Sequence, residues 1–412
     1  MSSFDRVSDR APANRMADPP HPAHFDTGAL LANAARQAGE RGFGDFLIVD
    51  ADAHHYESED WAEITRFIDQ PVIRQWSEAS MAKGGARPGM LVTQLGNQDI
   101  SGRISRYRLR SSEQLEAGIP RVVAQTRRSM TAMGIDVTVL FPTVMLNLGM
   151  HPQVEVEGAI AHAYARWMTE RILPADLSIK TMLYLPFNDP EASVRLVERF
   201  AGHPGVVGFM VTAVRYRPVH DNAYMGLYAA LEERGLPLGF HAAYNWYDRS
   251  MELFNRFISV HAVGFPFYQM VHMTNWVING MPERFPRLKV LWIEGGLAWV
   301  PFLMQRLDNE YMMRSSEAPL LRRKPSEYMR EMYYTSQPME YPDNLEVLET
   351  TFRMIDAPRQ LLYASDYPHW DFDLPSRVYD LPFLREEAKR RILGENAREL
   401  FGLPERKQAA AD

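Results

Sequence analysis

Four apolar segments of the chain are each followed directly by side chains that can bind a metal ion or move a proton. Residues 46–49 precede Asp52 and His54, residues 238–240 precede His241, residues 290–293 precede Glu294, and residues 361–364 precede Asp366. Charged side chains are costly to bury without a partner. Four such segment ends therefore predict one shared site that holds a ligand.

Asp52 and His54 stand at alternate positions after the first segment. In an extended chain alternate side chains point to the same side, and His55 points to the other side. A carboxylate and an imidazole aimed at one place suit a divalent metal ion. A polar turn with nothing bound is the alternative for these two residues taken alone.

The composition restricts the kinds of site that the chain can build. The 412 residues include no cysteine, so any metal must be held by His, Asp and Glu. A net charge of −7 without a long basic run argues against nucleic acid as the main partner. No stretch approaches the roughly 18 apolar residues of a membrane span, and the chain does not begin with a secretion signal. We expect a cytoplasmic protein.

Apolar strand patterns and amphipathic helix patterns alternate along most of the chain. Strands are predicted at 46–49, 135–141, 179–185, 206–213, 238–243, 288–293, 332–336 and 361–364, and all but the first are followed closely by a helix. Eight such units predict a (β/α)8 TIM-type barrel with parallel strands. The rival, an open doubly wound sheet, is weakened by the lack of a Gly-rich loop after the first strand.

The predicted domain boundaries follow from this alternation. Residues 1–44 are predicted to be a flexible N-terminal arm with a short helix near residues 28–39, residues 45–403 the barrel, and residues 404–412 a C-terminal tail. A long insertion after the first strand, residues 58–131, is expected to cap a pocket. It carries Arg103, Arg106, Arg108 and Arg110, which are either a solvated face or a site for a substrate carboxylate.

Several motifs resemble the amidohydrolase-related superfamily (amidohydrolase family 2), in the branch of aminocarboxymuconate semialdehyde decarboxylase. The matching stretches are Val-Asp-Ala-Asp-Ala-His at 49–54, His241, Met-Pro-Glu-Arg-Phe-Pro-Arg-Leu-Lys-Val at 281–290, and Ala-Ser-Asp-Tyr-Pro at 364–368. The resemblance covers about residues 46–403. It implies a metal-dependent (β/α)8 barrel whose site lies at the carboxyl ends of the strands.

The resemblance also implies a set of metal ligands: Asp52, His54, His241 and Asp366. Asp52 stands where the family more often has histidine. Glu294 stands where many decarboxylases of the family have a histidine that handles protons. One divalent ion, zinc or manganese, fits the two carboxylates and two imidazoles.

Such an ion would lower the pKa of a bound water or polarise a substrate oxygen. We expect Asp366 to accept a proton beside the ion, and Glu294 to act as a second acid or base, a further ligand, or an orienter of a ligand. His261 is predicted to contact the substrate or transfer a proton.

The first interpretation of function is a metal-dependent hydrolase that directs activated water at a small aromatic or ring-cleavage compound. The alternative is a non-oxidative decarboxylase of a small carboxylated aromatic or muconate-type compound, and a second alternative is a metal-free binding protein on a degenerate barrel. Aromatic residues after the same strand ends indicate a pocket for a planar substrate: Tyr56, Tyr244, Trp246, Tyr247, Tyr367 and Trp370. The resemblance further implies a homodimer, with residues 270–276 as a candidate surface.

Overall fold

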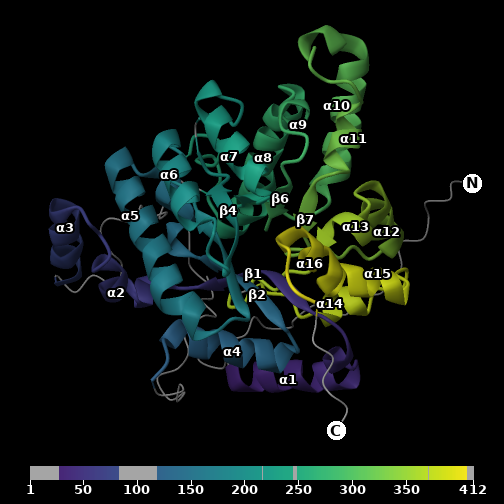
Figure 1. Ribbon diagram of the computed structural model, residues 1–412. Coiled ribbons are helices and arrows are strands. Elements are labelled where there is room, and N and C mark those ends of the chain that lie inside the picture. Colours follow the sequence, from purple (N-terminus) through teal and green to yellow (C-terminus); the bar gives the residue numbers. More distant parts are fainter. Residues whose placement is uncertain (1–26, 83–117, 216, 245–247, 370, 406–412) are drawn as a thin grey trace, which may run out of the picture.

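The computed structural model describes residues 27–82, 118–215, 217–244, 248–369 and 371–405. Within these residues eight parallel strands follow one another in chain order around a single sheet (Figure 1). The strands are β1 (Val49–His55), β2 (Val137–Pro142), β3 (Ile179–Tyr184), β4 (Val206–Thr212), β5 (Leu238–His241), β6 (Val290–Ile293), β7 (Tyr333–Thr335) and β8 (Leu361–Leu362). Each predicted strand is present, most with ends shifted by one or two residues.

The sheet closes on itself where β1 meets the segment that begins with β8. The backbone N–H of Ala51 donates to the carbonyl of Tyr363 over 2.9 Å, and the N–H of His54 donates to the carbonyl of Tyr367 over 2.8 Å. The N–H of Asp366 donates back to the carbonyl of Asp52 over 2.7 Å. The predicted (β/α)8 barrel is therefore confirmed, and its closure joins the two segments that carry the first and last candidate ligands.

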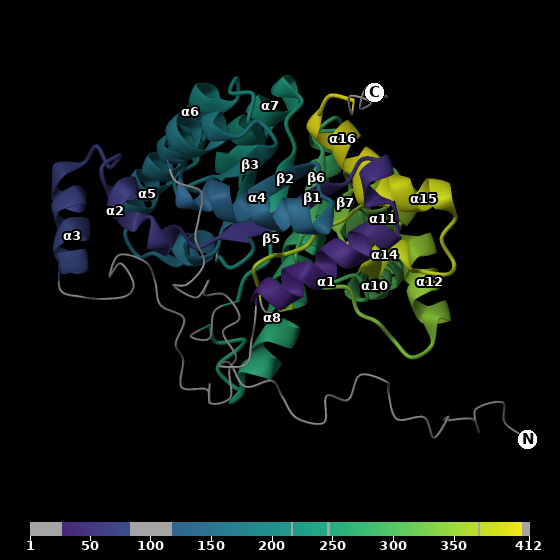
Figure 2. The same cartoon turned by 90° about the horizontal axis from the view of Figure 1, so that it is seen from below.

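Helices surround the barrel and connect its strands (Figures 1 and 2). They are α1 (Thr27–Glu40), α2 (Trp61–Thr65), α3 (Pro71–Ala82), α4 (Arg121–Met133), α5 (Val154–Trp167), α6 (Pro190–Phe200), α7 (Met225–Arg234), α8 (Phe257–Ile278), α9 (Met281–Arg284), α10 (Trp299–Arg314), α11 (Pro325–Met329), α12 (Leu345–Met354), α13 (Ala357–Gln360), α14 (Ser376–Tyr379), α15 (Glu386–Arg390) and α16 (Asn396–Phe401).

The region before β2 differs from the sequence prediction in two ways. The sequence prediction assigned the residues of α4 to the insertion, but α4 directly precedes β2 in the chain. Its buried face packs on the core of the barrel through Val123 and Met130. Helix α1 lies within the predicted arm but packs against α4, with Leu31 and Phe43 in the core (Figure 1). The packed body therefore begins before residue 45. The four insertion arginines lie outside the described residues.

The barrel interior is filled by side chains of unequal size. Gly208 and Gly239 face Met182, and a Cβ on either glycine would lie 3.0 Å or less from the Met182 methyl group. One long side chain from β3 thus occupies the space left by two glycines, one on β4 and one on β5. This packing is typical of a barrel with a solid core, so ligands are left to its carboxyl end.

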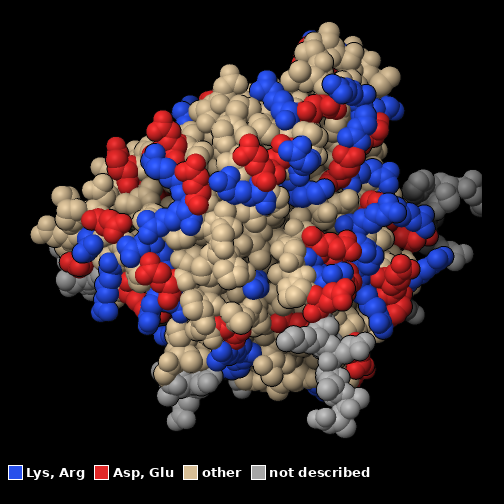
Figure 3. Space-filling model, viewed as in Figure 1, with Lys and Arg blue, Asp and Glu red and all other residues tan. Residues whose placement is uncertain are grey.

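Helix α8 extends beyond the barrel in Figure 2. Met273 and Trp276, in the segment considered for dimerisation, are buried in the chain's own core, while Val271 is 41% exposed. No helix among the described residues is both long and apolar enough to cross a bilayer. Positive and negative side chains are intermixed over the face in Figure 3.

Candidate metal centre

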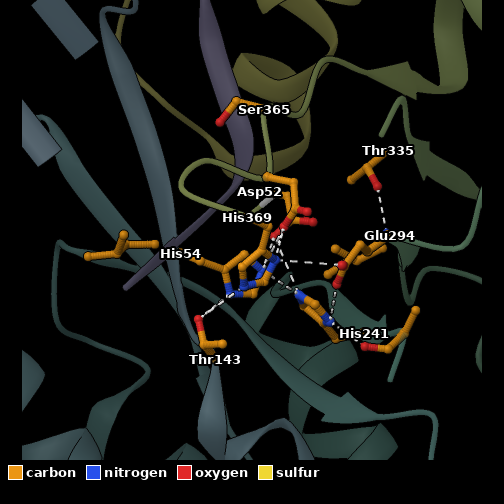
Figure 4. A network of polar contacts seen from close by, with 12 residues as sticks. Asp52, His54, Thr143, His241, Glu294, Thr335, Ser365 and His369 are labelled. Atoms are coloured by element: carbon orange, nitrogen blue, oxygen red, sulfur yellow. Dashed lines mark hydrogen bonds and ion pairs between the residues drawn. The ribbon is translucent and has the colours of Figure 1, made fainter. Parts of the chain in front are cut away.

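Five side chains from four strand ends converge at the carboxyl end of the barrel (Figure 4). Asp52 and His54 come from β1, His241 ends β5, Glu294 follows β6, and His369 lies in the loop after β8. Asp366 joins this group, because its carboxylate oxygen lies 3.4 Å from His54 Nε2. All six residues are buried.

Strand β1 runs through the site rather than ending before it. It extends to His55 and is irregular between Asp50 and Ala53, where the register against β2 shifts. Asp52 and His54 still face the same side, as their alternation predicted. His55 faces away, and its Nε2 lies 2.8 Å from the hydroxyl of Tyr164.

The candidate ligand atoms lie at distances that suit one ion. His54 Nε2 is 3.2 Å from both Asp52 Oδ1 and His241 Nε2, and Asp52 Oδ1 is 3.4 Å from His241 Nε2. Atoms that each lie about 2.0–2.2 Å from a shared ion are separated from one another by roughly 3.0–3.5 Å. These three side chains are therefore spaced as the ligands of one ion would be.

Backbone carbonyls fix the tautomers of the two histidines. His54 Nδ1 lies 3.1 Å from the carbonyl of Pro142, and His241 Nδ1 lies 2.8 Å from the carbonyl of Ala242. A carbonyl only accepts, so each Nδ1 carries a hydrogen, and in its neutral form each ring directs the lone pair of Nε2 into the cluster. Two such lone pairs 3.2 Å apart repel each other unless a proton or a metal ion lies between them.

The carboxylates of the cluster also have the properties expected of ligands to a cation. Among the described residues, both oxygens of Asp52, Oδ2 of Asp366 and Oε2 of Glu294 are buried without a hydrogen-bond partner. The other oxygen of Asp366, Oδ1, faces His369 Nδ1 over 2.6 Å. Leaving a buried charged oxygen unpaired costs several kcal/mol. The donor set, three carboxylates and neutral imidazoles without sulfur, fits a divalent ion such as manganese or zinc.

The backbone at two strand ends is held in an unfavourable conformation. Glu294 has φ 59° and Asp366 has φ 58°, in the left-handed region that costs a residue with a side chain about 1–3 kcal/mol. The N–H of Glu294 donates to Thr335 Oγ1 over 2.9 Å. Ser365, next to Asp366, donates through its N–H and hydroxyl to the carboxylate of Asp50. The surrounding hydrogen bonds thus maintain turns that direct both carboxylates inward.

His369 lies in the cluster, although the sequence prediction did not include it among the site residues. Its Nδ1 lies 2.6 Å from Asp366 Oδ1 and 3.7 Å from Glu294 Oε1, and its Nε2 lies 3.2 Å from Thr143 Oγ1. Its ring stacks on that of His54 with centroids 4.1 Å apart. The only sequence signal was its position three residues after Asp366. The ligand atoms of Asp52, His54, His241 and Glu294 form one group of mutually close atoms, and those of His54, Glu294, Asp366 and His369 form a second.

The electrostatics of this group favour a retained proton. Burial alone would lower the pKa of His369, but the charge of Asp366 and its contact with the ring raise that pKa well above the ordinary value, with a further contribution from Glu294. Burial, followed by the charge of Glu294, raises the pKa of Asp366. Burial also raises the pKa of Glu294. A proton is therefore held among these three side chains.

The rest of the site matches the sequence prediction only in part. His261, in the first turns of α8, is not among the groups of ligand atoms in the described chain and instead lies 3.8 Å from Asp371. Tyr56 lies edge-on to His369 with ring centroids 6.3 Å apart, and with Tyr367 it lines a cavity that reaches His54. Trp246, Tyr247 and Trp370 lie outside the described residues.

Comparison with known proteins places this arrangement in a family. A model of the amidohydrolase family matches residues 118–403. The fold is similar to 5-carboxyvanillate decarboxylase LigW from Sphingomonas paucimobilis, at 20% identity and TM-score 0.62 over 87% of this chain and 100% of that chain. An amidohydrolase from Mycobacterium avium subsp. paratuberculosis K-10 gives 20% identity and TM-score 0.63, with coverage of 87% and 100%.

A third similar structure contains a metal. The dihydroxybenzoic acid decarboxylase from Polaromonas sp. JS666, solved with manganese and the inhibitor 2-nitroresorcinol, is 16% identical with a TM-score of 0.60. The match covers 87% of this chain and 97% of that chain. At these identities the likeness concerns the fold.

Proposed function

The chain belongs to the amidohydrolase family, and on that premise we propose that it is a metal-dependent, non-oxidative decarboxylase of a small hydroxylated aromatic acid. Two proteins of similar fold are a 5-carboxyvanillate decarboxylase and a dihydroxybenzoic acid decarboxylase. The sequence suggested a hydrolase first and a decarboxylase as the alternative, and we now prefer the decarboxylase. The proposed substrate is still a small carboxylated aromatic compound.

The Asp366–His369 pair carries the proposal. Non-oxidative decarboxylation breaks the bond between the ring carbon and the carboxylate, and the ring carbon keeps the electron pair and must receive a proton. Glu294 replaces the histidine expected to deliver that proton, which made the decarboxylase doubtful from sequence. His369 supplies an imidazole next to the same position, 3.7 Å from Glu294 Oε1.

Asp52, His54, His241 and Asp366 are the residues that would hold the ion. Their unpaired buried oxygens and inward lone pairs support this assignment. When bound, a divalent ion there supplies positive charge that attracts the oxygen atoms of an anionic substrate. Glu294 is close enough to be a further ligand, and its Oε2 also lies 3.4 Å from His241 Nδ1.

The chain's own side chains then manage the proton. Asp366 and Glu294 favour the imidazolium form of His369, and Thr143 Oγ1 lies beside Nε2. The imidazolium gives its proton to the ring carbon as carbon dioxide leaves, and it is recharged from solvent, since 11% of the His369 side chain is exposed. Tyr56 and Phe141 contact the cluster rings and exclude water from part of the site.

A hydrolase is the second candidate, and Glu294 favours it. A carboxylate in place of the family histidine can accept a proton from an attacking water. That role requires an ionised Glu294 at neutral pH, whereas burial raises its pKa. Burial thus works against that role of Glu294, and we place the hydrolase second.

The proposal is tested on purified protein that has been stripped with a chelator and then reloaded with manganese or zinc. We expect carbon dioxide release from at least one carboxylated phenol by the reloaded protein and none by the stripped protein. Asp366→Asn is expected to abolish turnover while leaving the circular dichroism spectrum intact. Protein that binds no divalent ion would instead support the metal-free binding protein. Reloaded protein that cleaves only amides or esters would support the hydrolase.

A further inference from the structure

His261 and Asp371 form a polar pair outside the metal centre. His261 Nε2 lies 3.8 Å from Asp371 Oδ2, and the two side chains are 14% and 17% exposed. His261 belongs to the first turns of α8, which follows β5, and Asp371 belongs to the loop after β8. Loops and helix starts that follow barrel strands lie at the carboxyl end of the barrel, so both residues lie on the face that carries the metal centre.

Aromatic rings surround the histidine of this pair. The ring of His261 lies 4.7 Å from that of Phe265, 5.3 Å from that of Phe257 and 6.0 Å from that of Tyr244. Apolar surroundings strengthen any hydrogen bond made there and make an unpaired polar group more costly. The pair therefore has the surroundings of a recognition site rather than those of a solvated surface pair.

The carboxylate of Asp371 retains its capacity to accept hydrogen bonds. Within the described part of the chain, its recorded contact is the 3.8 Å pair with His261, which is too long for a hydrogen bond. The backbone carbonyl of Asp371 accepts from Gln337 Nε2 over 3.3 Å, which anchors the residue. An anchored acceptor without a donor suits a ligand that brings a hydroxyl group.

Asp371 lies close to the cluster along the chain. Asp371 is two residues beyond His369, so their Cα atoms are at most about 7.6 Å apart. Its negative charge also contributes to the raised pKa of Asp366.

We propose that His261 and Asp371 form the subsite that recognises a phenolic hydroxyl group remote from the carboxylate that leaves. The proposal rests on the decarboxylase function proposed above. The hydroxyl donates to Asp371, and His261 lies beside that carboxylate, with Nε2 3.8 Å from Oδ2. A second carboxylate on the substrate is disfavoured here, because Asp371 would repel it. His261 is thereby a positioning residue for the substrate and not the proton donor.

The test compares salicylate with each dihydroxybenzoate that keeps the ortho hydroxyl of salicylate, using manganese-loaded full-length protein. We expect the natural chain to prefer one dihydroxybenzoate. Asp371→Asn should lower kcat/KM for that isomer by about 10- to 100-fold more than for salicylate, the loss expected for a hydrogen bond to a charged group. Asp343→Asn, at an exposed acid in the loop after β7, is the matched control and should keep the preference of the natural chain.

A binding measurement keeps the inference testable if turnover is low in every variant. Resorcinol should bind the loaded natural chain more tightly than phenol in calorimetry, and His261→Phe and Asp371→Asn should each reduce that difference. Equal losses for salicylate and the preferred isomer, or equal affinities for phenol and resorcinol, would overturn the subsite. Absence of carbon dioxide from all carboxylated phenols would refute the decarboxylase, while the resorcinol measurement would still decide on the subsite.

Discussion

Binding of manganese should stabilise the protein against heat, because the metal centre holds unpaired charges in the free protein. An ion that binds the folded state alone adds about 2.7 kcal/mol at a concentration one hundred times its Kd. With an unfolding entropy of about 2.1 cal/mol/K for each of roughly 350 folded residues, this amounts to a rise in Tm of about 3–4 °C. Differential scanning fluorimetry of chelator-treated protein, with and without manganese, measures it.

Asp52→Asn should remove most of this shift. Both oxygens of Asp52 are buried without a hydrogen bond, and its Oδ1 lies within 3.4 Å of both ligand histidines. If the loss of this charge weakens binding about a hundredfold, the same manganese concentration adds only about 0.4 kcal/mol, or about half a degree. Asp343→Asn, an exposed acid, should keep the full shift.

Two results would refute this reasoning. An equal rise in Tm in Asp52→Asn would mean that the ion binds elsewhere. No rise in the natural chain with manganese, zinc or another divalent ion would mean that the cluster does not hold an ion, whatever the distances between its side chains.

Three further predictions concern the proton donor, the buried histidines and the packing behind the site. His369→Gln should lower kcat by about 10²- to 10⁴-fold with unchanged metal content by elemental analysis; unchanged kcat would remove His369 from the chemistry. Burial lowers the pKa of His55 to about 3, so the unfolded chain, with a pKa near 6.5, takes up the proton first as the pH falls. The metal-free protein should therefore lose about 2 kcal/mol through His55 between pH 7 and pH 5, and urea unfolding of His55→Gln at both pH values should show a correspondingly smaller loss. Gly295→Ala should destabilise the fold by about 2–4 kcal/mol, because the new Cβ collides with the amide of Gln269, which donates to the carbonyls of Phe240 in β5 and Ile293 in β6. Gly158→Ala, where a Cβ meets nothing, should cost nothing in the same urea titration.

The sequence was sufficient to predict the barrel and to identify strand ends that meet at its carboxyl end. Residues 206–213 form a continuous apolar run, and the corresponding strand β4 is buried at all seven positions, as expected for a parallel strand covered on both sides. His241 and Glu294 follow such runs directly, so the fold class alone placed them at one end of the barrel. The distances among them required the structure.

Two features could not be read from the sequence. Strand β1 was predicted to stop at Val49, where polar residues begin, but it continues to His55 because a closed barrel can enclose polar side chains that surround a site. His369 follows Asp366 across a left-handed residue and a turn, so its return to the cluster depends on the backbone path rather than on a repeating pattern. Periodicity predicts faces of regular elements and gives no information about such a loop.

The most direct test of the proposed decarboxylase uses its preferred hydroxylated benzoate, labelled with carbon-13 at the carboxyl group, in deuterated water with manganese-loaded protein. The proposal predicts labelled carbon dioxide and a phenol in equal amounts, with deuterium on the ring carbon that lost the carboxyl group. Turnover that releases no labelled carbon dioxide, and that places an oxygen atom from water in the product, would contradict it.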